Sequence, residues 1–179
     1  MNHFNLKLNT NIFIKTKRLI LKPIEEKYID DIYESFTSEV TKFMPFNPQG
    51  NKNEIIDFVL NSKKGLLEKT DIVFVVLDID EKFMGCCGIH NINPESIEVG
   101  LWLKKESQGQ GFGTEIITKI IEFIEQNFKV EYILYPVDEE NIASRKIPEK
   151  LGFIPFKTYK KPKTDTNVLN IIEYRKHYS

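Results

Sequence analysis

Three glycines at alternate positions, Gly109, Gly111 and Gly113, stand between an apolar segment typical of a strand and one typical of a helix. A glycine-rich loop at such a place exposes backbone N–H groups in the first turn of the helix, where they have no partners within the helix. These unpaired donors and the positive end of the helix dipole favour an anion such as a phosphate. The segment from Gln108 to Thr114 therefore predicts a phosphate-binding loop.

Three common glycine motifs do not describe this loop. A P-loop needs a longer spacer that ends in Gly-Lys-Ser/Thr, and neither the spacer nor the lysine is present. A dinucleotide-binding fingerprint needs a glycine at the position of Thr114. Kinase glycine loops join two strands, whereas this loop precedes a helix. On the glycines alone, a flexible turn that binds nothing stays open as an alternative.

The segment before the loop, 97–103, alternates between apolar and other residues as a strand does. One face would carry Ile97, Val99, Leu101 and Leu103, and the other Glu98, Gly100 and Trp102. Gly100 in mid-strand indicates either a bulge or the close approach of a ligand to the backbone.

Strand and helix signals extend along the chain. Strands are predicted over 18–22, 72–77, 83–89, 97–103, 132–137, 153–159 and 168–174, and helices over 28–36, 55–67, 116–124 and 141–151. The turn 78–82 predicts a hairpin between its flanking strands. This order predicts an α/β (α+β) fold, a mixed sheet with helices on both faces, in one domain over 1–179.

Composition excludes several classes of protein. The chain has 179 residues, of which 41% are hydrophobic and 28% charged, and its net charge of -1 argues against a nucleic-acid partner. No apolar run approaches the ~20 residues of a membrane span, so we expect a cytoplasmic protein without a membrane partner. Cys86 and Cys87 are adjacent, and no Cys or His cluster has metal-ligand spacing. We therefore expect two buried, reduced cysteines and no metal.

Motifs on both sides of the loop resemble the GNAT superfamily of acetyl-CoA-dependent N-acetyltransferases, and most closely its RimJ/RimL-like branch. Gln108-x-x-Gly111-x-Gly113 is similar to the pyrophosphate-binding signature of that superfamily, Arg/Gln-x-x-Gly-x-Gly/Ala. The other matching stretches are 16–21, 88–92, 98–102, 141–144 and 149–153. The resemblance covers Thr16 to Phe153 and implies a GNAT-like, mostly antiparallel sheet flanked by helices on both faces.

The resemblance also implies how acetyl-CoA is bound. Backbone groups of the strand would hold the pantetheine arm, the glycine loop would hold the pyrophosphate, and Phe112 would pack inward or beside the cofactor. The implied contact residues are Leu101, Trp102, Leu103, Gln108, Gly109, Gln110, Gly111, Phe112, Gly113, Thr114, Asn141 and Ser144.

Two side chains match catalytic positions of the same branch. Glu98 matches the proposed general base, and its alternative is an ordinary strand carboxylate that faces solvent or pairs with a lysine. Ser144 matches the serine proposed to protonate the coenzyme thiolate, and its alternative is a serine that serves the backbone at a helix start. Pro148 stands where many members carry a tyrosine acid, so this position offers no hydroxyl, and it predicts a helix kink.

The acceptor is less well defined by the sequence. Phe43, Met44 and Phe46 in an aromatic loop are candidates for an acceptor pocket, and simple packing is their alternative. His90 is a further candidate, and its alternative is an ordinary hydrogen-bonded histidine. The resemblance implies direct attack of an amine, from a protein N-terminus or a small molecule, on the thioester. It also allows a homodimer. The competing hypothesis is a non-catalytic acyl-CoA-binding sensor or interaction module, which Pro148 favours and which Glu98 and Ser144 argue against.

Overall fold

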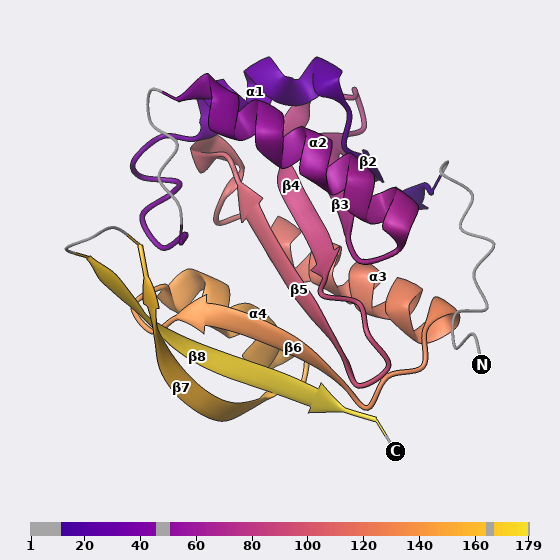
Figure 1. The fold of residues 1–179 in the computed structure, drawn as a ribbon, viewed down its shortest axis with the longest axis vertical. Coiled ribbons are helices and arrows are strands. Elements are labelled where there is room, and N and C mark those ends of the chain that lie inside the picture. The colour runs from indigo at the N-terminus through magenta and orange to yellow at the C-terminus, as the bar shows by residue number, and fades with distance from the viewer. Residues whose placement is uncertain (1–11, 46–50, 164–166, 179) are drawn as a thin grey trace.

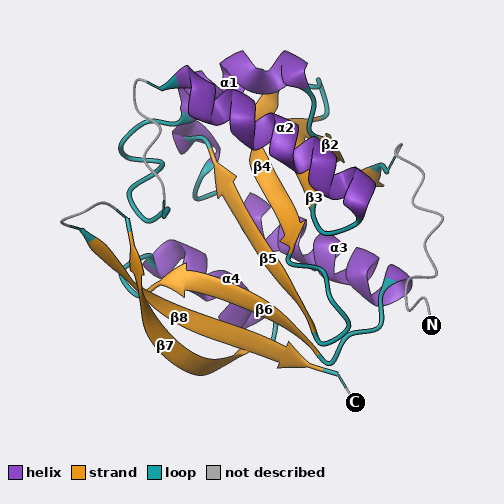
Figure 2. Ribbon diagram, in the orientation of Figure 1, coloured by secondary structure: helices purple, strands orange, loops and turns teal. Residues whose placement is uncertain are grey.

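The computed structural model describes residues 12–45, 51–163 and 167–178. In these ranges eight strands form one sheet, in the order β1-β2-β3-β4-β5-β6-β8-β7, with α helices on both faces (Figures 1 and 2). The strands are β1 Ile14–Lys15, β2 Leu19–Pro23, β3 Ile72–Asp78, β4 Phe83–His90, β5 Ser96–Leu103, β6 Tyr132–Asp138, β7 Ile154–Pro162 and β8 Val168–His177. The α helices are α1 Ile29–Ser35, α2 Lys52–Glu68, α3 Phe112–Asn127 and α4 Ile142–Lys150.

The sheet separates two apolar layers. In β3, Ile72, Phe74 and Val76 face one layer, while Val73 and Val75 face the other. This is why its apolar run is unbroken: a strand covered on both faces has no solvent side. The predicted fold class, a mixed α/β sheet with helices on both faces, is confirmed.

Each layer is closed by a different pair of helices. Helix α3 covers one face with its buried isoleucines, and Ile147 of α4 packs against the same layer. Helices α1 and α2 cover the other face through Ile32, Ile55 and Val59 (Figure 1). Helix α3 lies on one face of the sheet, and the segment 104–111 joins it to β5, which ends at Leu103.

The pairing of β5 with β6 is short. Neighbouring strands are antiparallel throughout the described sheet except for β5 and β6, which are parallel and pair only from Ser96 to Glu98. Beyond Glu98 the two strands diverge (Figure 1). The edge of β5 from Val99 to Leu103 is thus left without a strand partner among the described residues. Unpaired strand groups of this kind can receive hydrogen bonds from a ligand.

Three local predictions had different outcomes. The bulge at Gly100 is wrong, because β4 and β5 keep one continuous register across the Gly88–Gly100 pair. The helix kink at Pro148 stays a prediction: α4 continues past this proline to Lys150, with Pro148 buried in its last turn. Cys86 and Cys87 are both buried and free, as expected, and burial raises the pKa of both thiols.

Strand β1 is an element that the sequence did not predict. It spans only Ile14–Lys15, too few residues for an alternating pattern to be visible. No helix of the described ranges has both the length and the apolar character that crossing a membrane requires.

Candidate functional site

The loop between β5 and α3 leaves the first N–H groups of α3 without a side-chain cap. Gly109 and Gly111 have φ angles of 75° and 79°, in the left-handed region that favours glycine, and Gly111 is the N-cap of α3. Helices α2 and α4 differ, because Asn51 and Asn141 accept hydrogen bonds from their first turns. The uncapped N-terminus of α3 has the donor arrangement that binds a phosphate.

Two glutamine side chains hold this loop in shape. Gln108 Nε2 donates to the Leu103 carbonyl at 2.9 Å, and Gln110 Nε2 donates to the Glu106 carbonyl at 2.9 Å. Both amides are thus used to brace the turn between β5 and α3.

A further brace comes from the other end of the chain. Arg18 donates from Nη1 to the Gln110 carbonyl at 3.1 Å, and its guanidinium lies 4.2 Å from the centre of the Phe112 ring. Its Nε atom contacts Glu115 Oε2 at 2.8 Å, and Thr16 Oγ1 donates to the other carboxylate oxygen. Sequence reasoning noted the 16–21 stretch but assigned no role to Arg18.

The carboxyl group of Glu115 lies in the first turn of α3 and is partly buried. Burial on its own would raise the pKa of Glu115, but hydrogen bonds from Thr16 and Arg18, with the charge of Arg18, hold this pKa below its ordinary value. The Glu115 carboxylate is therefore ionised at neutral pH.

Glu98 lies where β5 and β6 part. It is the last residue of β5 paired with β6, and its half-buried carboxylate accepts a hydrogen bond from Asn91 Nδ2 at 3.2 Å. No lysine of the described ranges forms an ion pair with this carboxylate. Asn91 was not predicted: it follows β4 in a left-handed conformation, with φ of 52°, and this turn brings its amide back toward β5.

His90 lies opposite Glu98 in the register of β4 and β5. Its Nδ1 atom is 3.3 Å from Asp71 Oδ1, which also accepts from the backbone N–H of Asn91 at 3.3 Å. Asp71 thus orients both residues of the turn beside Glu98. These contacts are those of an ordinary hydrogen-bonded histidine, which is the alternative hypothesis for His90. Its position next to Glu98 is also compatible with a pocket residue.

Two glycines face each other across β4 and β5 on the Glu98 side of the sheet. A Cβ at Gly88 would lie 2.1 Å from His90 Nε2, so only glycine lets the His90 ring lie over the strand there. A Cβ at Gly100 would meet no described heavy atom within 4 Å, so the backbone here borders open space. Of the two explanations for Gly100, close approach of a ligand is the one that this geometry allows.

Ser144 lies in the first turn of α4, on the other side of the sheet. Its backbone N–H donates to Asn141 Oδ1 at 3.1 Å, which makes Asn141 the cap that the sequence suggested. Its hydroxyl lies 2.8 Å from the hydroxyl of Tyr135 in β6. Burial raises the pKa of Tyr135 to about 12, and the hydrogen bond with Ser144 opposes that rise only in part. Sequence reasoning did not single out Tyr135.

The predicted acceptor-loop residues Phe43 and Met44 lie in different surroundings. Phe43 lines a hollow of about 160 Å³ beside Asp138 and Leu169, and Met44 packs against the layer under α1 and α2. Phe46 lies outside the described residues. Lys163 joins this loop to the β7–β8 turn by donating to the carbonyls of Thr41 and Lys42.

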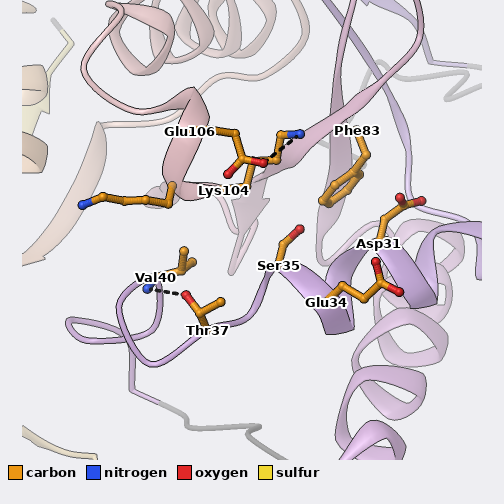
Figure 3. A pocket seen from close by; sticks show the side chains of 9 residues that line it. Asp31, Glu34, Ser35, Thr37, Val40, Phe83, Lys104 and Glu106 are labelled. Atoms are coloured by element: carbon orange, nitrogen blue, oxygen red, sulfur yellow. Dashed lines mark hydrogen bonds and ion pairs between the residues drawn. The ribbon is translucent and has the colours of Figure 1, made fainter.

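A second hollow, of about 310 Å³, lies between α1 and the segment after β5 (Figure 3). Asp31, Glu34, Phe83 and Lys104 are among its lining residues, and Lys104 is itself paired with Glu106. Lys104 is about 20 Å from Glu98 along the strand at 3.3 Å per residue. This hollow therefore lies beyond the C-terminal end of β5, away from Glu98. No group of three His, Cys, Asp or Glu side chains in the described ranges is placed to hold a metal ion.

Comparison with known proteins gives one family. The family model described as acetyltransferase (GNAT) domain matches residues 18–154. The uncharacterized N-acetyltransferase p20 of Bacillus licheniformis is 29% identical over 145 residues, which cover 77% of this chain and 80% of that protein. The putative ribosomal N-acetyltransferase YdaF of Bacillus subtilis is 27% identical over 77 residues, 42% of each chain.

Solved structures share the fold at low identity. An acetyltransferase from Salmonella typhimurium that modifies the N-terminal serine of ribosomal protein L7/L12 has a TM-score of 0.80 and 13% identity, covering 94% of this chain and 100% of that chain. Mycobacterium smegmatis RimJ, in complex with CoA-disulfide, has a TM-score of 0.81 and 14% identity, covering 92% and 86%. A GNAT acetyltransferase from Bacillus anthracis has a TM-score of 0.77 and 21% identity, covering 93% and 98%.

Proposed function

The chain belongs to the GNAT family of acetyl-CoA-dependent N-acetyltransferases, and on this premise we propose that it acetylates a primary amine with Glu98 as the general base. The observation that carries the proposal is the parting of β5 and β6 directly after Glu98. This opening lies on the same strand that leads into the uncapped loop before α3. A donor bound along β5 would therefore end beside the Glu98 carboxylate.

The residues present fit acetyl-CoA. The uncapped N–H groups that follow Gly111 suit a pyrophosphate, and the unpaired edge of β5 from Val99 to Leu103 suits the amides of a pantetheine arm. The open space at Gly100 leaves room for a ligand against the backbone. When bound, acetyl-CoA supplies an activated acetyl thioester.

Glu98 would prepare the acceptor. An amine is a nucleophile only when neutral, and most primary amines are protonated near pH 7. A carboxylate held by Asn91 and free of lysine partners among the described residues can accept that proton, directly or through a water. The ion-pair alternative for Glu98 has no support in the contacts of this region.

Ser144 would assist the departing sulfur. Its hydroxyl is placed by the Asn141 cap at the start of α4 and by Tyr135. An O–H donor aimed at a developing thiolate stabilises its charge as the bond to the acyl carbon breaks. The position of Pro148, with no hydroxyl to offer, leaves this task to Ser144 or to water.

The acceptor is a primary amine of either of two kinds. One relative of known structure is described as modifying a protein N-terminal serine, which supports an N-terminal α-amine. The paired charges near Lys104 and the polar hollow beside Phe43 do not form an acidic cleft of the sort that selects polyamines. A small-molecule amine therefore stays as the second acceptor class.

The experiment is the Glu98→Gln variant, tested with an amine panel of peptides, amino acids and small amines. We expect kcat at pH 7 to fall by about 100-fold while the Kd for acetyl-CoA stays within about twofold, because the carboxylate acts on the acceptor. The deficit should shrink as the pH rises, since more of the amine is then neutral without a base.

The control is Glu106→Gln, which removes an exposed carboxylate beyond the end of β5. Unchanged turnover in Glu98→Gln would remove Glu98 from the mechanism. Acetyl-CoA binding by the unaltered protein, without thiol release for any amine in the panel, would instead favour the non-catalytic sensor.

A further inference from the structure

Two hydroxyl groups, one in β6 and one in the first turn of α4, form a hydrogen-bonded pair. Tyr135 belongs to β6 and is 2% exposed, whereas Ser144 belongs to α4 and is half-buried. Their oxygen atoms are 2.8 Å apart, within normal hydrogen-bond distance. The Tyr135 hydroxyl thus lies in the protein core, and the Ser144 hydroxyl lies nearer the surface.

The direction of this hydrogen bond follows from the surroundings of Tyr135. Among the described residues, the Tyr135 hydroxyl has one hydrogen-bond partner, Ser144 Oγ. A buried O–H without an acceptor costs about 1–3 kcal/mol, so the phenol donates and Ser144 accepts. With one of its two lone pairs engaged by Tyr135, Ser144 keeps its own proton available for donation to another group.

Both members of the pair are held in place. The ring of Tyr135 packs edge-on against Phe153, with centroids 6.5 Å apart, and the N–H of Ser144 is bound by Asn141. A fixed pair of this kind leaves the serine hydroxyl few orientations.

The Ser144 end of this hydrogen-bonded pair lies beside the proposed cofactor groove. Ile147 is one turn after Ser144 on α4, so the two side chains share a face of the helix. Ile147 Cδ1 lies 2.7 Å from the point that a Cβ on Gly113 would occupy, and Leu101 Cδ1 lies 3.5 Å from it. This face of α4 therefore packs beside the first turn of α3 and near the Leu101 side chain of β5.

We propose that Tyr135 is a positioning residue for the reaction: by donating to Ser144, it directs the Ser144 O–H toward the sulfur of the bound thioester. This inference rests on the proposed function, because it assigns the departing sulfur to the Ser144 side of the groove. Tyr135 itself touches neither substrate nor cofactor in this arrangement.

The chain provides a matched control for Tyr135→Phe. Tyr174 is the register partner of Tyr135 on β8, it is 1% exposed, and its hydroxyl also bonds to α4, donating to Glu149 at 2.6 Å and accepting from Arg145. The Tyr174→Phe variant removes a buried tyrosine hydroxyl that bonds to the same helix, and it leaves the Ser144 hydrogen bonds in place.

We expect Tyr135→Phe to lower kcat by about five- to tenfold with the KM for acetyl-CoA within about twofold, the effect of one hydrogen bond. Ser144→Ala should lower kcat by a similar factor, and the double variant should show no further loss, because both changes remove the same donor. Tyr174→Phe should keep kcat within about twofold.

A second readout needs no turnover. The pKa of the thiol in bound coenzyme A can be followed by the ultraviolet absorbance of the thiolate. A free thiol titrates near pH 8.5, and an O–H donor aimed at the sulfur lowers that value. We expect the bound thiol to titrate at least about half a unit higher in Tyr135→Phe and in Ser144→Ala than in the unaltered protein or in Tyr174→Phe.

Three results would overturn the inference: an unchanged kcat and thiol titration in Tyr135→Phe, multiplying losses in the double variant, or an equal kcat loss in Tyr174→Phe. If Tyr135→Phe does not fold, an unchanged thiol titration in Ser144→Ala overturns it, and a raised one supports it. If the unaltered protein binds acetyl-CoA but acetylates no amine, the proposed function fails, and the thiol titration still decides whether Tyr135 and Ser144 face the sulfur.

Discussion

At the scale of single residues, Gly111 connects backbone conformation to ligand binding. Its φ of 79° lies in the left-handed region, and it is the N-cap of the helix whose N–H groups are uncapped. A Cβ placed there would have Arg18 Nη2 at 3.7 Å, an ordinary contact. The cost of a side chain at this position is therefore conformational rather than steric.

We expect Gly111→Ala to weaken acetyl-CoA binding by about tenfold. Left-handed backbone costs an alanine roughly 1–2 kcal/mol, and a loop that relaxes to avoid this cost turns its N–H groups away from the pyrophosphate. Isothermal titration calorimetry measures the change in Kd.

Gly152→Ala is the matched control for this prediction. Gly152 follows α4 with φ of 80°, and a Cβ there would meet no described heavy atom within 4 Å. The same conformational cost then falls outside the loop, so stability should decrease while the Kd stays unchanged. Equal weakening of binding in both variants would contradict a specific role for the Gly111 conformation.

At the scale of elements, Arg18 joins the N-terminal hairpin to the start of α3. The guanidinium contacts the Gln110 carbonyl, the Phe112 ring and the Glu115 carboxylate. These contacts link strand β2 to both the loop and the helix that would bind the pyrophosphate. Loop geometry thus depends on a residue almost a hundred positions earlier in the chain.

We expect Arg18→Met to raise the Kd for acetyl-CoA by about fivefold, because the loop loses its brace and a nearby positive charge. Calorimetric titration measures this change. Lys22→Met, in strand β2 just after Arg18, removes a cation that pairs with Glu81 and should leave the Kd as it is. A similar loss in both variants would show that general charge, rather than the brace, is responsible.

The Glu115 carboxylate contributes stability that the folded protein loses at acid pH. Its pKa is held below the ordinary value, so the folded state favours the ionised form. A group with a lowered folded pKa contributes stability above its unfolded pKa and loses that contribution as the pH falls through the folded value. The contribution is thus complete above about pH 5 and decreases below it.

We expect the free energy of unfolding of the unaltered protein to fall more steeply than that of Glu115→Gln as the pH is lowered from about 6 to about 3.5. Urea unfolding at a series of pH values measures the difference. Parallel curves for the two proteins would contradict a folded-state origin for the lowered pKa.

At the scale of the whole molecule, the sheet consists of two parts with a short junction. Strands β1 to β5 are joined to β6, β8 and β7 by the parallel pairing of Ser96–Glu98 with Tyr132–Leu134. The Lys163 contacts to the Thr41 and Lys42 carbonyls form a second link between the two parts. A ligand in the opening after Glu98 would add contacts to β5 where strand pairing ends.

We expect acetyl-CoA at 100 times its Kd to raise the free energy of unfolding by about 2.7 kcal/mol, as for any ligand that binds only the folded state. Urea unfolding with and without the ligand measures this. Hydrogen exchange should slow at the β5 amides from Val99 to Leu103, and AMP, which lacks the pantetheine arm, should not slow it. Equal protection by AMP would contradict binding of the arm along β5.

Much of the fold could be predicted because its signals are local. The five isoleucines of α3, the unbroken run of β3 and the Asn141 cap each depend on residues within one or two turns or strands. The sequence signal of the glycine loop is local as well, since glycine conformation and a helix start are properties of neighbouring residues. The bulge at Gly100 was wrong because a mid-strand glycine has several causes, and only the register of β4 distinguishes them.

The sequence by itself determined the mixed sheet with two helical layers and the glycine loop before α3, and it indicated Glu98 and Ser144 as candidate side chains. Only the tertiary structure decided which side chains support them: Arg18 for the loop, Asn91 for Glu98 and Tyr135 for Ser144. The physical reason is that a hydrogen bond depends on distances of about 3 Å between atoms. Sheet order and strand divergence set those distances, and no local pattern of residues encodes them.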